Sequence, residues 1–331
     1  MSKTVLTFDI GESYIKIAHK ENERISVYVE QMPENLVKDG VIQMPHMMTD
    51  FLKQLKKEYH LPKGECGVVV PDELTVCRTL TLPAMTEKQL EVNLPFEFSD
   101  YISGEPQKYV YDYAVQRMIN DEDGNPKEMV LTGAVMSKEA VTNYINIFKN
   151  AGFKLRTLVP QEIALTNIMK KALEEGRVEA GKEYCIVNLG HRATQVYIFR
   201  GDELTVIRNI LVGNAMLDQV ISENENVDAY VARTYKNKNY NDILDREYAR
   251  ETYGRIAVEI MKVINFYRFN NRDTRLEEMY FAGGGSNMTG LCESIAQAND
   301  LTGKSIMELL PKNVDYNTDA SGILAIGVLL Q

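Results

Sequence analysis

The sequence predicts an α/β protein built from two similar halves with a cleft between them. Three observations support this prediction. A run of short β-rich segments opens the chain, a similar run begins near Tyr184, and helical periodicity follows each run. Alternating apolar residues between turn residues are typical of strands, whereas apolar residues three and four apart are typical of helices.

The first half opens with three strand-like runs, which we expect at residues 4–9, 14–18 and 25–29. Gly11 marks the turn between the first two runs, and residues 21–24 mark the turn between the second and the third. Tight turns between consecutive strands predict an antiparallel meander.

The second half repeats this layout at a constant spacing, because Gly190 lies 179 residues after Gly11. The same spacing aligns apolar residues of the following strands: Ile17 with Val196, Ile25 with Leu204, and Val27 with Val206. A glycine after a strand and the two strands that follow it all coincide, so we favour an internal duplication. Two unrelated hairpins in one α/β protein are the alternative.

Helices are expected after each meander, at residues 48–59 and 140–150 in the first half and at about 244–269 in the second. Each range carries apolar residues on one face. Gly152 is the expected stop of the second helix. The polar segment 174–182 is the expected end of the first half.

Composition excludes several classes of protein. Lys and Arg number 37 against 47 Asp and Glu, and the net charge of −10 disfavours nucleic acid and anionic lipid as partners. The 4 cysteines are too few and too scattered for a disulfide scaffold or a zinc ribbon. The first residues lack the layout of a signal peptide, and the apolar run 322–330 is too short to span a bilayer. We therefore expect a cytoplasmic protein with no direct membrane insertion.

Three glycine-containing turns are candidates for a phosphate site. Asp9-Ile10-Gly11 ends the first strand; its N–H groups can face a phosphate, its carboxylate can hold Mg²⁺ through water, and Lys16 can reach a phosphate. Residues 187–194 are its counterpart in the second half. In the third turn, an apolar strand runs into Gly283-Gly284-Gly285 and then a helix with Ser286 as the expected N-cap. A plain hairpin or loop is the alternative for each turn taken singly.

Two polar pairs complete the set of candidates. Glu259 and Lys262 share a helix face and form either a surface ion pair or, if the helix lines the cleft, a pair that holds a ribose and a base. Gln161 and Glu162 begin a helical run. A side-chain amide there can orient an attacking water, although a polar residue at a helix start is more often a cap.

Together these motifs resemble the actin-like ATPase superfamily. Within it the chain is similar, over nearly its whole length, to the PilM family of type IV pilus assembly proteins, which are relatives of the division protein FtsA. The resemblance also rests on residues 36–42 (LVKDGVI), 78–90 (RTLTLPAMTEKQL), 151–153 (AGF), 259–262 (EIMK) with Phe266-Tyr267, and 322–330. It implies an actin-like ATPase fold, in which two duplicated RNase H-like domains flank a nucleotide cleft.

The resemblance also implies domain boundaries and ligands. The first actin-like domain is expected at residues 1–77 and 154–180, an inserted subdomain at 78–153, and the second actin-like domain at 181–331. ATP and Mg²⁺ are the implied cofactors, with Asp9 holding Mg²⁺ through water and Gln161 in the catalytic position. The residues implied to contact the nucleotide are Asp9, Gly11, Glu12, Ser13, Lys16, Asn188, Gly190, His191, Arg192, Thr194, Gly213, Glu259, Lys262, Gly283, Gly284, Gly285, Ser286 and Met288.

Three departures from the family pattern weaken the expected site. Glu12 stands where Ser or Thr is usual, Asn188 where Asp is usual, and Gly213-Asn214 where two glycines are usual. The Glu12 carboxylate repels phosphates unless a cation intervenes, and Asn188 brings no charge to a metal. We therefore expect at most weak ATPase activity. Glu12 can pair with His191 or Arg192 across the cleft, or all three can point to solvent.

The leading functional hypothesis is a scaffold protein of type IV pilus assembly. In the family, the inserted subdomain and the neighbouring surface receive the N-terminal cytoplasmic peptide of PilN, an inner-membrane protein. Recruitment to the cytoplasmic face of the membrane by a PilN-like partner is therefore implied, because no counterpart of the membrane helix that ends FtsA is seen. Pilus motor or platform proteins are further expected partners. An active ATPase or small-molecule kinase is the alternative, with Glu162 as the candidate base.

Within residues 78–153 we expect a helical run over 87–101, interrupted by Pro95, and strands at 109–115 and 129–135. A helix and short strands without a large apolar mass leave an exposed edge or groove, which can take an extended peptide through main-chain hydrogen bonds. The acidic residues of this segment either suit basic residues of such a peptide or are merely solvated: Glu87, Glu91, Glu97 and Asp100.

Overall fold

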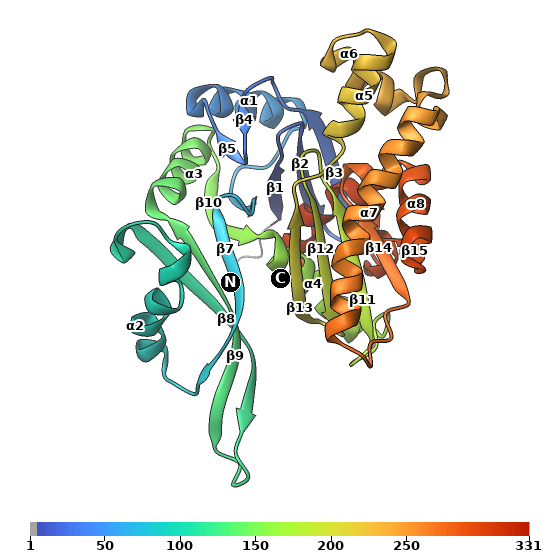
Figure 1. Ribbon diagram of the computed structural model, residues 1–331. Coiled ribbons are helices and arrows are strands. Elements are labelled where there is room, and N and C mark those ends of the chain that lie inside the picture. The colour runs from blue at the N-terminus through green and yellow to red at the C-terminus, as the bar shows by residue number, and fades with distance from the viewer. Residues whose placement is uncertain (1–4, 331) are drawn as a thin grey trace. The chain divides into compact units, whose positions relative to one another are not determined.

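The computed structural model describes residues 5–330, which divide into two compact units of mixed α/β structure (Figure 1). Of the described residues, unit 1 holds 5–167, 314–317 and 324–330, and unit 2 holds 168–313 and 318–323. Within residues 5–330, no helix is both long enough and apolar enough to cross a bilayer.

Unit 1 is built on a six-stranded sheet of order β10-β6-β1-β2-β3-β16. Its strands are β1 (Leu6–Ile10), β2 (Tyr14–Glu21), β3 (Arg24–Gln31), β6 (Glu65–Val70), β10 (Lys154–Pro160) and β16 (Asp315–Asn317). The antiparallel pairing of β1, β2 and β3 confirms the predicted meander, while β6 runs parallel to both β1 and β10. Thr4, the expected first residue of the first strand, lies outside the described residues.

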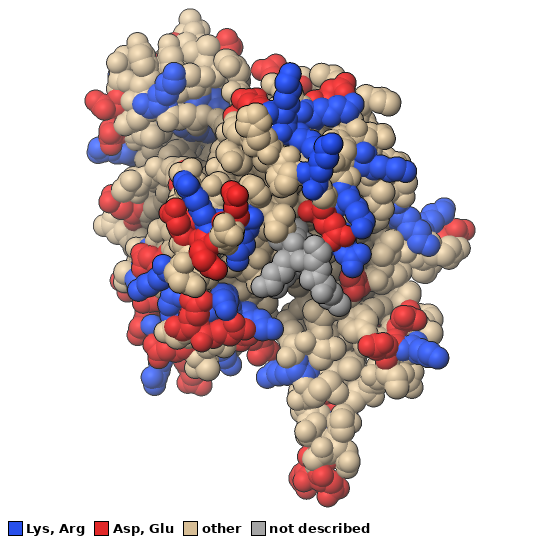
Figure 2. All heavy atoms as spheres, turned by 180° about the vertical axis from the view of Figure 1, so that it is seen from behind, with Lys and Arg blue, Asp and Glu red and all other residues tan. Residues whose placement is uncertain are grey.

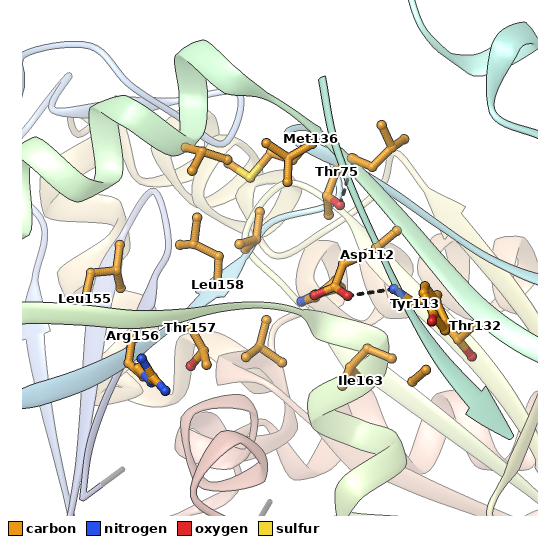
Figure 3. Close-up of a pocket in the computed structure, with 18 of the residues that line it drawn as sticks. Thr75, Asp112, Tyr113, Thr132, Met136, Leu155, Arg156, Thr157, Leu158 and Ile163 are labelled. Atoms are coloured by element: carbon orange, nitrogen blue, oxygen red, sulfur yellow. Dashed lines mark hydrogen bonds between the residues drawn. The ribbon is translucent and has the colours of Figure 1, made fainter. Parts of the chain in front are cut away.

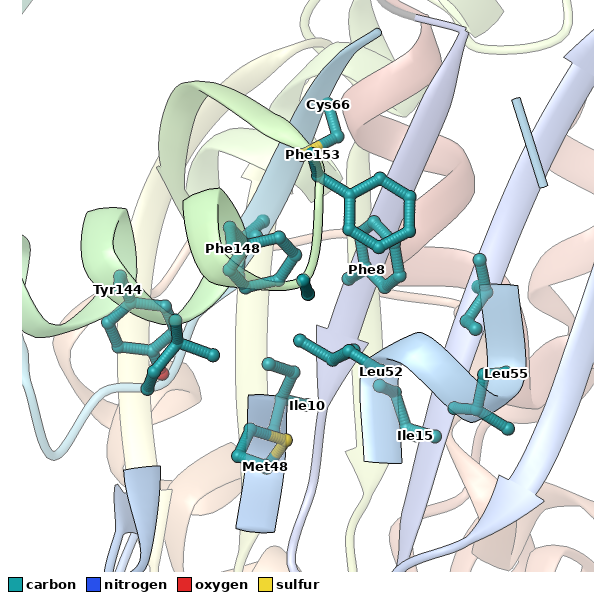
Figure 4. Packing of buried hydrophobic residues seen from close by; sticks show 14 of the residues in the cluster. Phe8, Ile10, Ile15, Met48, Leu52, Leu55, Cys66, Tyr144, Phe148 and Phe153 are labelled. Carbon is teal, nitrogen blue, oxygen red and sulfur yellow. The ribbon is translucent and has the colours of Figure 1, made fainter. Parts of the chain in front are cut away.

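Helices cover both faces of this sheet. On one face, α1 (Pro45–Glu58) and α3 (Lys138–Asn150) pack over Phe8, whose ring centroid lies 5.0 Å from that of Phe148 and 5.2 Å from that of Phe153 (Figure 4). On the other face, the Thr7 hydroxyl donates to the carbonyl of Ala325 in α9 (Ile323–Leu329) at 2.7 Å. The start of α4 (Gln161–Glu174) packs against the same helix through Ala164.

A two-stranded hairpin follows β3 and consists of β4 (Val37–Lys38) and β5 (Val41–Ile42). Asp39 and Gly40 between them both have a positive φ, at 51° and 69°. Two consecutive left-handed residues are typical of the type I′ turn, which Asp-Gly favours. The segment with the sequence LVKDGVI is therefore a tight hairpin.

The segment between β6 and β10 forms a second, three-stranded sheet of order β7-β9-β8. Its elements are β7 (Thr75–Pro83), α2 (Glu87–Glu97), β8 (Tyr109–Asn120) and β9 (Pro126–Ser137), with 3-10 segments at Ser99–Tyr101 and Pro106–Lys108. Pro95 lies inside α2 and does not interrupt it, contrary to the prediction; the helix ends at Glu97, before the predicted end at Tyr101. The β8–β9 hairpin is longer than predicted because pairing continues past Val115 through two register shifts. Exposed acidic residues gather at its tip, 121–123 (Figure 2).

The expectation that this segment lacks a large apolar mass is wrong. One face of the β7-β9-β8 sheet and the inner face of α2 enclose a separate core: Leu80, Leu82, Leu90, Leu94, Phe98, Met129, Leu131 and Val135. Gly133 permits the close approach of Phe98, because a Cβ at Gly133 would lie 3.0 Å from its ring. The segment is thus a small subdomain with its own core.

Unit 2 has a five-stranded sheet of order β13-β12-β11-β14-β15. Its strands are β11 (Glu183–Leu189), β12 (Thr194–Arg200), β13 (Glu203–Ile210), β14 (Glu278–Ala282) and β15 (Thr302–Ser305). Its helices are α5 (Ala215–Glu225), α6 (Ala229–Lys238), α7 (Glu247–Asn270) and α8 (Thr289–Asn299), with 3-10 segments at Tyr240–Asp245, Gly284–Asn287, Ile306–Leu309 and Ala320–Gly322. The helix α7 begins later than predicted because left-handed residues at 241 and 242 bend the preceding segment.

The strand register supports the internal duplication. The Gly11 N–H donates to the Tyr14 carbonyl at 3.0 Å, and the Gly190 N–H donates to the Ala193 carbonyl at 3.1 Å, with 179 residues between equivalent atoms. Phe8 pairs with Ile17 and Val187 with Val196, again at that spacing. A register shift between Ile198 and Phe199 breaks the gap-free alignment further on. Val27 therefore corresponds to Ile207 and not to Val206, since their partners Ala18 and Tyr197 are the equivalent pair.

We predict that Gly327→Ala destabilises the protein, because a Cβ at Gly327 would lie 2.2 Å from the Ala164 carbonyl oxygen. Overpacking of this kind costs ~1–3 kcal/mol or more. Gly254→Ala in α7 is the matched control, since no atom lies within 4 Å of its added Cβ and alanine favours a helix by about 1 kcal/mol. The free energy of unfolding in urea should be highest for Gly254→Ala, intermediate for the wild type and lowest for Gly327→Ala. Equal stability of Gly327→Ala and the wild type would contradict the close packing of Gly327 against Ala164.

Candidate functional site

The turn after β1 is held by an ion pair. Asp9 and Lys16 are directly opposite each other on β1 and β2, and the Lys16 Nζ lies 3.1 Å from the Asp9 Oδ2. Both side chains are nearly buried, with 17% and 13% of their areas exposed. Asp9, the predicted Mg²⁺ ligand, and Lys16, the predicted phosphate ligand, therefore neutralise each other in an ion pair.

The equivalent turn of unit 2 carries a neutral version of this pair. Asn188 and Gln195 stand 179 residues after Asp9 and Lys16, and the Asn188 amide donates to the Gln195 Oε1 at 3.1 Å. The Asn188 side chain is buried. One position of the duplicated turn is therefore an ion pair in unit 1 and an amide pair in unit 2.

Glu12 is tied to the β4–β5 hairpin of its own unit. Its carboxylate accepts a hydrogen bond from the main-chain N–H of Asp39. The neighbouring Ser13 is buried, and its hydroxyl has no hydrogen-bond partner within the described part of the chain. A serine or threonine at position 12 could not reach as far as a glutamate, so this contact accounts for the departure from the family pattern.

Three glycine turns converge in unit 2. Gly283, with a φ of 79°, would place a Cβ 2.4 Å from the Asn188 Oδ1 and 2.8 Å from the Leu189 carbonyl oxygen. A Cβ at Gly213 would lie 2.5 Å from the His191 carbonyl oxygen. The structure therefore brings together the predicted residues 188–191, Gly213 and 283–285 at the ends of β11 and β14.

Ser286 is not the N-cap that the sequence predicts. Its hydroxyl donates to the Gly283 carbonyl at 2.7 Å inside a 3-10 segment, and α8 begins at Thr289, after Met288. The glycines tighten the chain into this turn before the α-helix can start. Met288 itself is buried in the apolar core of unit 2.

A buried charge cluster beside the second turn was missed in the sequence. The Asp218 carboxylate of α5 lies 2.6 Å from the Lys236 Nζ, 3.4 Å from the Arg233 Nε and 3.8 Å from the His191 Nδ1. Lys236 also donates to the Asn214 carbonyl at 3.2 Å. In the sequence, the three-residue spacing of Arg233 and Lys236 indicates that both cations lie on one face of a helix, which is the one sign of this cluster.

His191 is uncharged at neutral pH. Burial, followed by the positive charge of Arg233, lowers the pKa of His191 to about 4. His191 therefore brings no positive charge to a phosphate or to a carboxylate such as that of Glu12.

The remaining predicted residues have local partners. The Thr194 hydroxyl donates to the Val212 carbonyl at 2.7 Å and so joins β12 to the turn before α5. Glu259 and Lys262 form an ion pair of 2.6 Å on α7, where the lysine side chain is 63% exposed. A surface ion pair, one of the two interpretations of this spacing, accounts for that contact.

Gln161 and Glu162 are both buried at the start of α4. Burial, followed by the charge of Asp72, raises the pKa of Glu162. Burial likewise raises the pKa of Asp72, in the segment between β6 and β7. Among the described residues, no hydrogen-bond partner meets the Glu162 Oε2 or the Asp72 Oδ1. A carboxyl pKa raised toward neutral pH is compatible with a general base, so Glu162 stays the candidate base of the kinase alternative.

A metal ion does not fit the residues that the sequence offered. Asp9 is already paired with Lys16, and its counterpart is the neutral Asn188. Within residues 5–330, no three or more His, Cys, Asp or Glu side chains are grouped to hold a metal. Mg²⁺ prefers one or two carboxylates that are open to it.

A pocket of about 430 Å³ lies in unit 1 between the inserted subdomain and β10 (Figure 3). Its lining is mainly apolar and comes from β8, β9, β10, α3 and the start of α4. Asp112 and Arg156 are its charged lining residues. Sequence reasoning placed a groove in this region but did not identify β10 as one of its walls.

We predict that Glu162→Gln flattens the dependence of stability on pH. Because the folded-state pKa of Glu162 is raised, its contribution is fully present at low pH and is lost as the pH rises through that pKa. The melting temperature of the wild type should therefore fall from about pH 5 to about pH 9 more steeply than that of Glu162→Gln. Glu122→Gln, at the exposed hairpin tip, should follow the wild type; parallel curves for all three proteins would contradict the assignment.

We predict that Gly283→Ala destabilises unit 2, whereas Gly284→Ala is tolerated. An added Cβ at Gly283 would clash with the Asn188 Oδ1. The backbone of Gly283, with φ of 79° and ψ of 174°, suits only glycine, and another residue there costs ~1–3 kcal/mol of stability. At Gly284 no atom lies within 4 Å of the added Cβ. Thermal unfolding compares the two variants, and equal melting temperatures would show that the turns do not converge as described.

Comparison with known proteins shows the family. The family model of the type IV pilus assembly protein PilM matches residues 7–314. No curated protein sequence matches the chain.

Several solved structures share the fold. The PilM–PilN type IV pilus biogenesis complex matches with a TM-score of 0.83 and 19% identity, covering 99% of this chain and 98% of that chain. The ethanolamine utilization protein EutJ from Carboxydothermus hydrogenoformans matches with a TM-score of 0.60 and 14% identity, over 98% and 88% of the two chains. MreB5 of Spiroplasma citri bound to AMPPNP matches with a TM-score of 0.54 and 10% identity, over 99% and 95%. These likenesses confirm the actin-like ATPase fold, and the family model shows that the chain belongs to the PilM family of type IV pilus assembly proteins.

Proposed function

We propose that this chain is an adaptor of type IV pilus assembly that binds the N-terminal cytoplasmic tail of a PilN-like inner-membrane protein in the pocket of unit 1. Binding of that tail recruits the chain to the cytoplasmic face of the membrane. Family membership and the fold shared with a PilM–PilN complex support the partner. The pocket beside the inserted subdomain is the observation that carries the proposal.

The chemistry of the pocket suits an extended, mostly apolar peptide segment. Val110 on β8 and Ile145 on α3 line the pocket and remain 41% and 45% exposed, so both present apolar surface to a ligand. Leu155 and Leu158 add apolar area from β10. An apolar lining with a few placed polar groups is typical of ligand sites, and about 430 Å³ lies within their usual size.

The acidic residues of α2 lie away from this pocket, which favours the second of their two interpretations, a solvated face, over a role beside the peptide. On β9, Leu131 and Val135 pack in the core closed by α2, while Thr132 and Ala134 line the pocket from the opposite face. The charges of α2 therefore lie on the far side of the small sheet. A basic residue of the tail would instead meet Asp112.

We also propose a weak nucleotide site at the converged glycine turns of unit 2. Glycine turns and the start of α5 suit a phosphate-bearing ligand, and Gly284 presents an open main chain there. ATP bound at this site would supply a phosphoryl group. The paired Asp9 and the neutral Asn188 leave Mg²⁺ without a matched site, so adaptor function is favoured over an active ATPase or kinase.

We predict that Ala114→Trp weakens tail binding, because Ala114 lines the pocket and an indole ring would fill it. Val92→Trp is the matched control, since Val92 is 64% exposed on α2, on the far side of the small sheet. Fluorescence anisotropy with a labelled tail peptide measures both affinities. Loss of at least ~10-fold in affinity is expected for Ala114→Trp alone; unchanged affinity of Ala114→Trp would place the tail elsewhere.

We predict that ATP hydrolysis stays near background with Mg²⁺ present, because the carboxylate that relatives carry at position 188 is an amide here. Asn188→Asp should raise phosphate release if the rest of the site is competent. Steady-state phosphate release measures both proteins. Robust Mg²⁺-dependent turnover by the wild type would favour the ATPase alternative.

A further inference from the structure

We propose that the tail segment binds as an added strand along the edge of β10, so that the six-stranded sheet of unit 1 gains a seventh strand inside the pocket. This inference rests on the proposed function and specifies how the same site recognises its partner. It names an extended segment with apolar residues at alternate positions as the ligand.

The lining residues of β10 indicate that the hollow meets this strand at its outer edge; Val70, at the end of β6, and Thr75, at the start of β7, also line it. Side chains of a strand alternate between the two faces of its sheet, so a hollow on one face is lined by every second residue. Here six consecutive residues of β10 line the pocket, from Leu155 to Pro160. Leu155 and Leu158 lie on one side of the β10 ribbon, and Thr157 on the other (Figure 3).

The packing of β10 agrees with this assignment. Leu155 and Leu158 pack against the core beneath α1 and α3, whereas the Thr157 Oγ1 lies on the opposite face, 3.0 Å from a Cβ placed on Gly67 and beside Val328 of α9. A register shift around Arg156 brings Leu155 and Leu158 to the same face. The pocket therefore touches side chains from both faces of one strand.

The outer edge of β10 is open to pairing. Among the described residues, β10 is the terminal strand of its sheet and pairs with β6 alone. An edge strand carries a row of unpaired N–H and C=O groups, and an extended peptide can bind by completing that row. The length available is short, because Arg156 lies at an irregularity and Pro160 has no N–H to donate.

β8 also ends a sheet, but it meets the pocket differently. Its lining residues are chiefly Val110, Asp112 and Ala114, which alternate along the strand, with Tyr113 beside them. β9 likewise contributes chiefly Thr132, Ala134 and Met136, with Val135 beside them. The inserted subdomain thus offers the pocket a sheet face, against which side chains of the added strand can pack.

The bound segment would place its side chains alternately toward two apolar walls. Val141 of α3 packs against the same core as Leu155 and Leu158, whereas Ile163 of α4 lies on the other side of the β10 ribbon (Figure 3). Main-chain hydrogen bonds to β10 would supply affinity for any extended segment, and the two walls would select apolar residues.

Methylation of single amide nitrogens of the tail peptide tests the inference. The probe is a synthetic peptide with the N-terminal cytoplasmic sequence of the PilN-like protein of the same organism, bound to the full chain. Added-strand binding predicts losses of at least ~10-fold at alternate positions in the centre of the peptide, with the intervening positions as internal controls within ~3-fold of the parent. Losses without alternation would overturn the inference.

Hydrogen–deuterium exchange identifies which edge is used. With the parent peptide bound, main-chain amides of residues 154–159 should exchange more slowly, while those of 109–115 should change little. Slower exchange at 109–115 and not at 154–159 would show that the tail pairs with β8 instead of β10. That result would overturn the β10 assignment but not the proposed binding in the pocket. Failure of the parent peptide to bind, or its full retention by Ala114→Trp, would overturn the proposed function and this inference with it.

Discussion

The open edge of β10 is the constraint on which the proposed site depends. The sheet of unit 1 ends at this strand, and the inserted subdomain continues as a separate sheet instead of pairing with it. Because α2 closes the core on one face of the small sheet, the other face, with Val110 and Ala114, lines the pocket. A strand edge and a sheet face together bound a hollow that suits an extended peptide.

The two copies of the duplicated turn share their geometry but differ in charge. At the same register, unit 1 carries the ion pair of Asp9 and Lys16, and unit 2 carries the amide pair of Asn188 and Gln195. The neutral pair lies where Gly283 approaches most closely, and two cations near this turn, Arg233 and Lys236, pair with Asp218. The charged groups of these ion pairs are therefore bound to each other and not to a metal or a phosphate. This pairing favours an adaptor over an efficient ATPase.

Periodicity and glycine placement made the fold predictable, because strand alternation and turn residues are local signals. The constant spacing of 179 residues located both meanders, but it missed the register shift at Ile198, which depends on pairing with β13. Partners distant in sequence were not predictable: Asp218 with Lys236, Glu162 with Asp72, and the wall that β10 gives the pocket. Ser286 failed as a cap because three glycines form a tighter turn than a helix start.

Site-specific photo-crosslinking in cells tests where the tail of the PilN-like protein binds. A benzophenone side chain replaces either Ile145, which lines the pocket from α3, or Phe96, which is exposed on α2. The first position lies at the proposed binding site, and the second lies on the far side of the small sheet. We expect irradiation to join the PilN-like protein to the variant substituted at position 145 and not to that at position 96. Crosslinks from position 96 alone would contradict a tail seated between the inserted subdomain and β10.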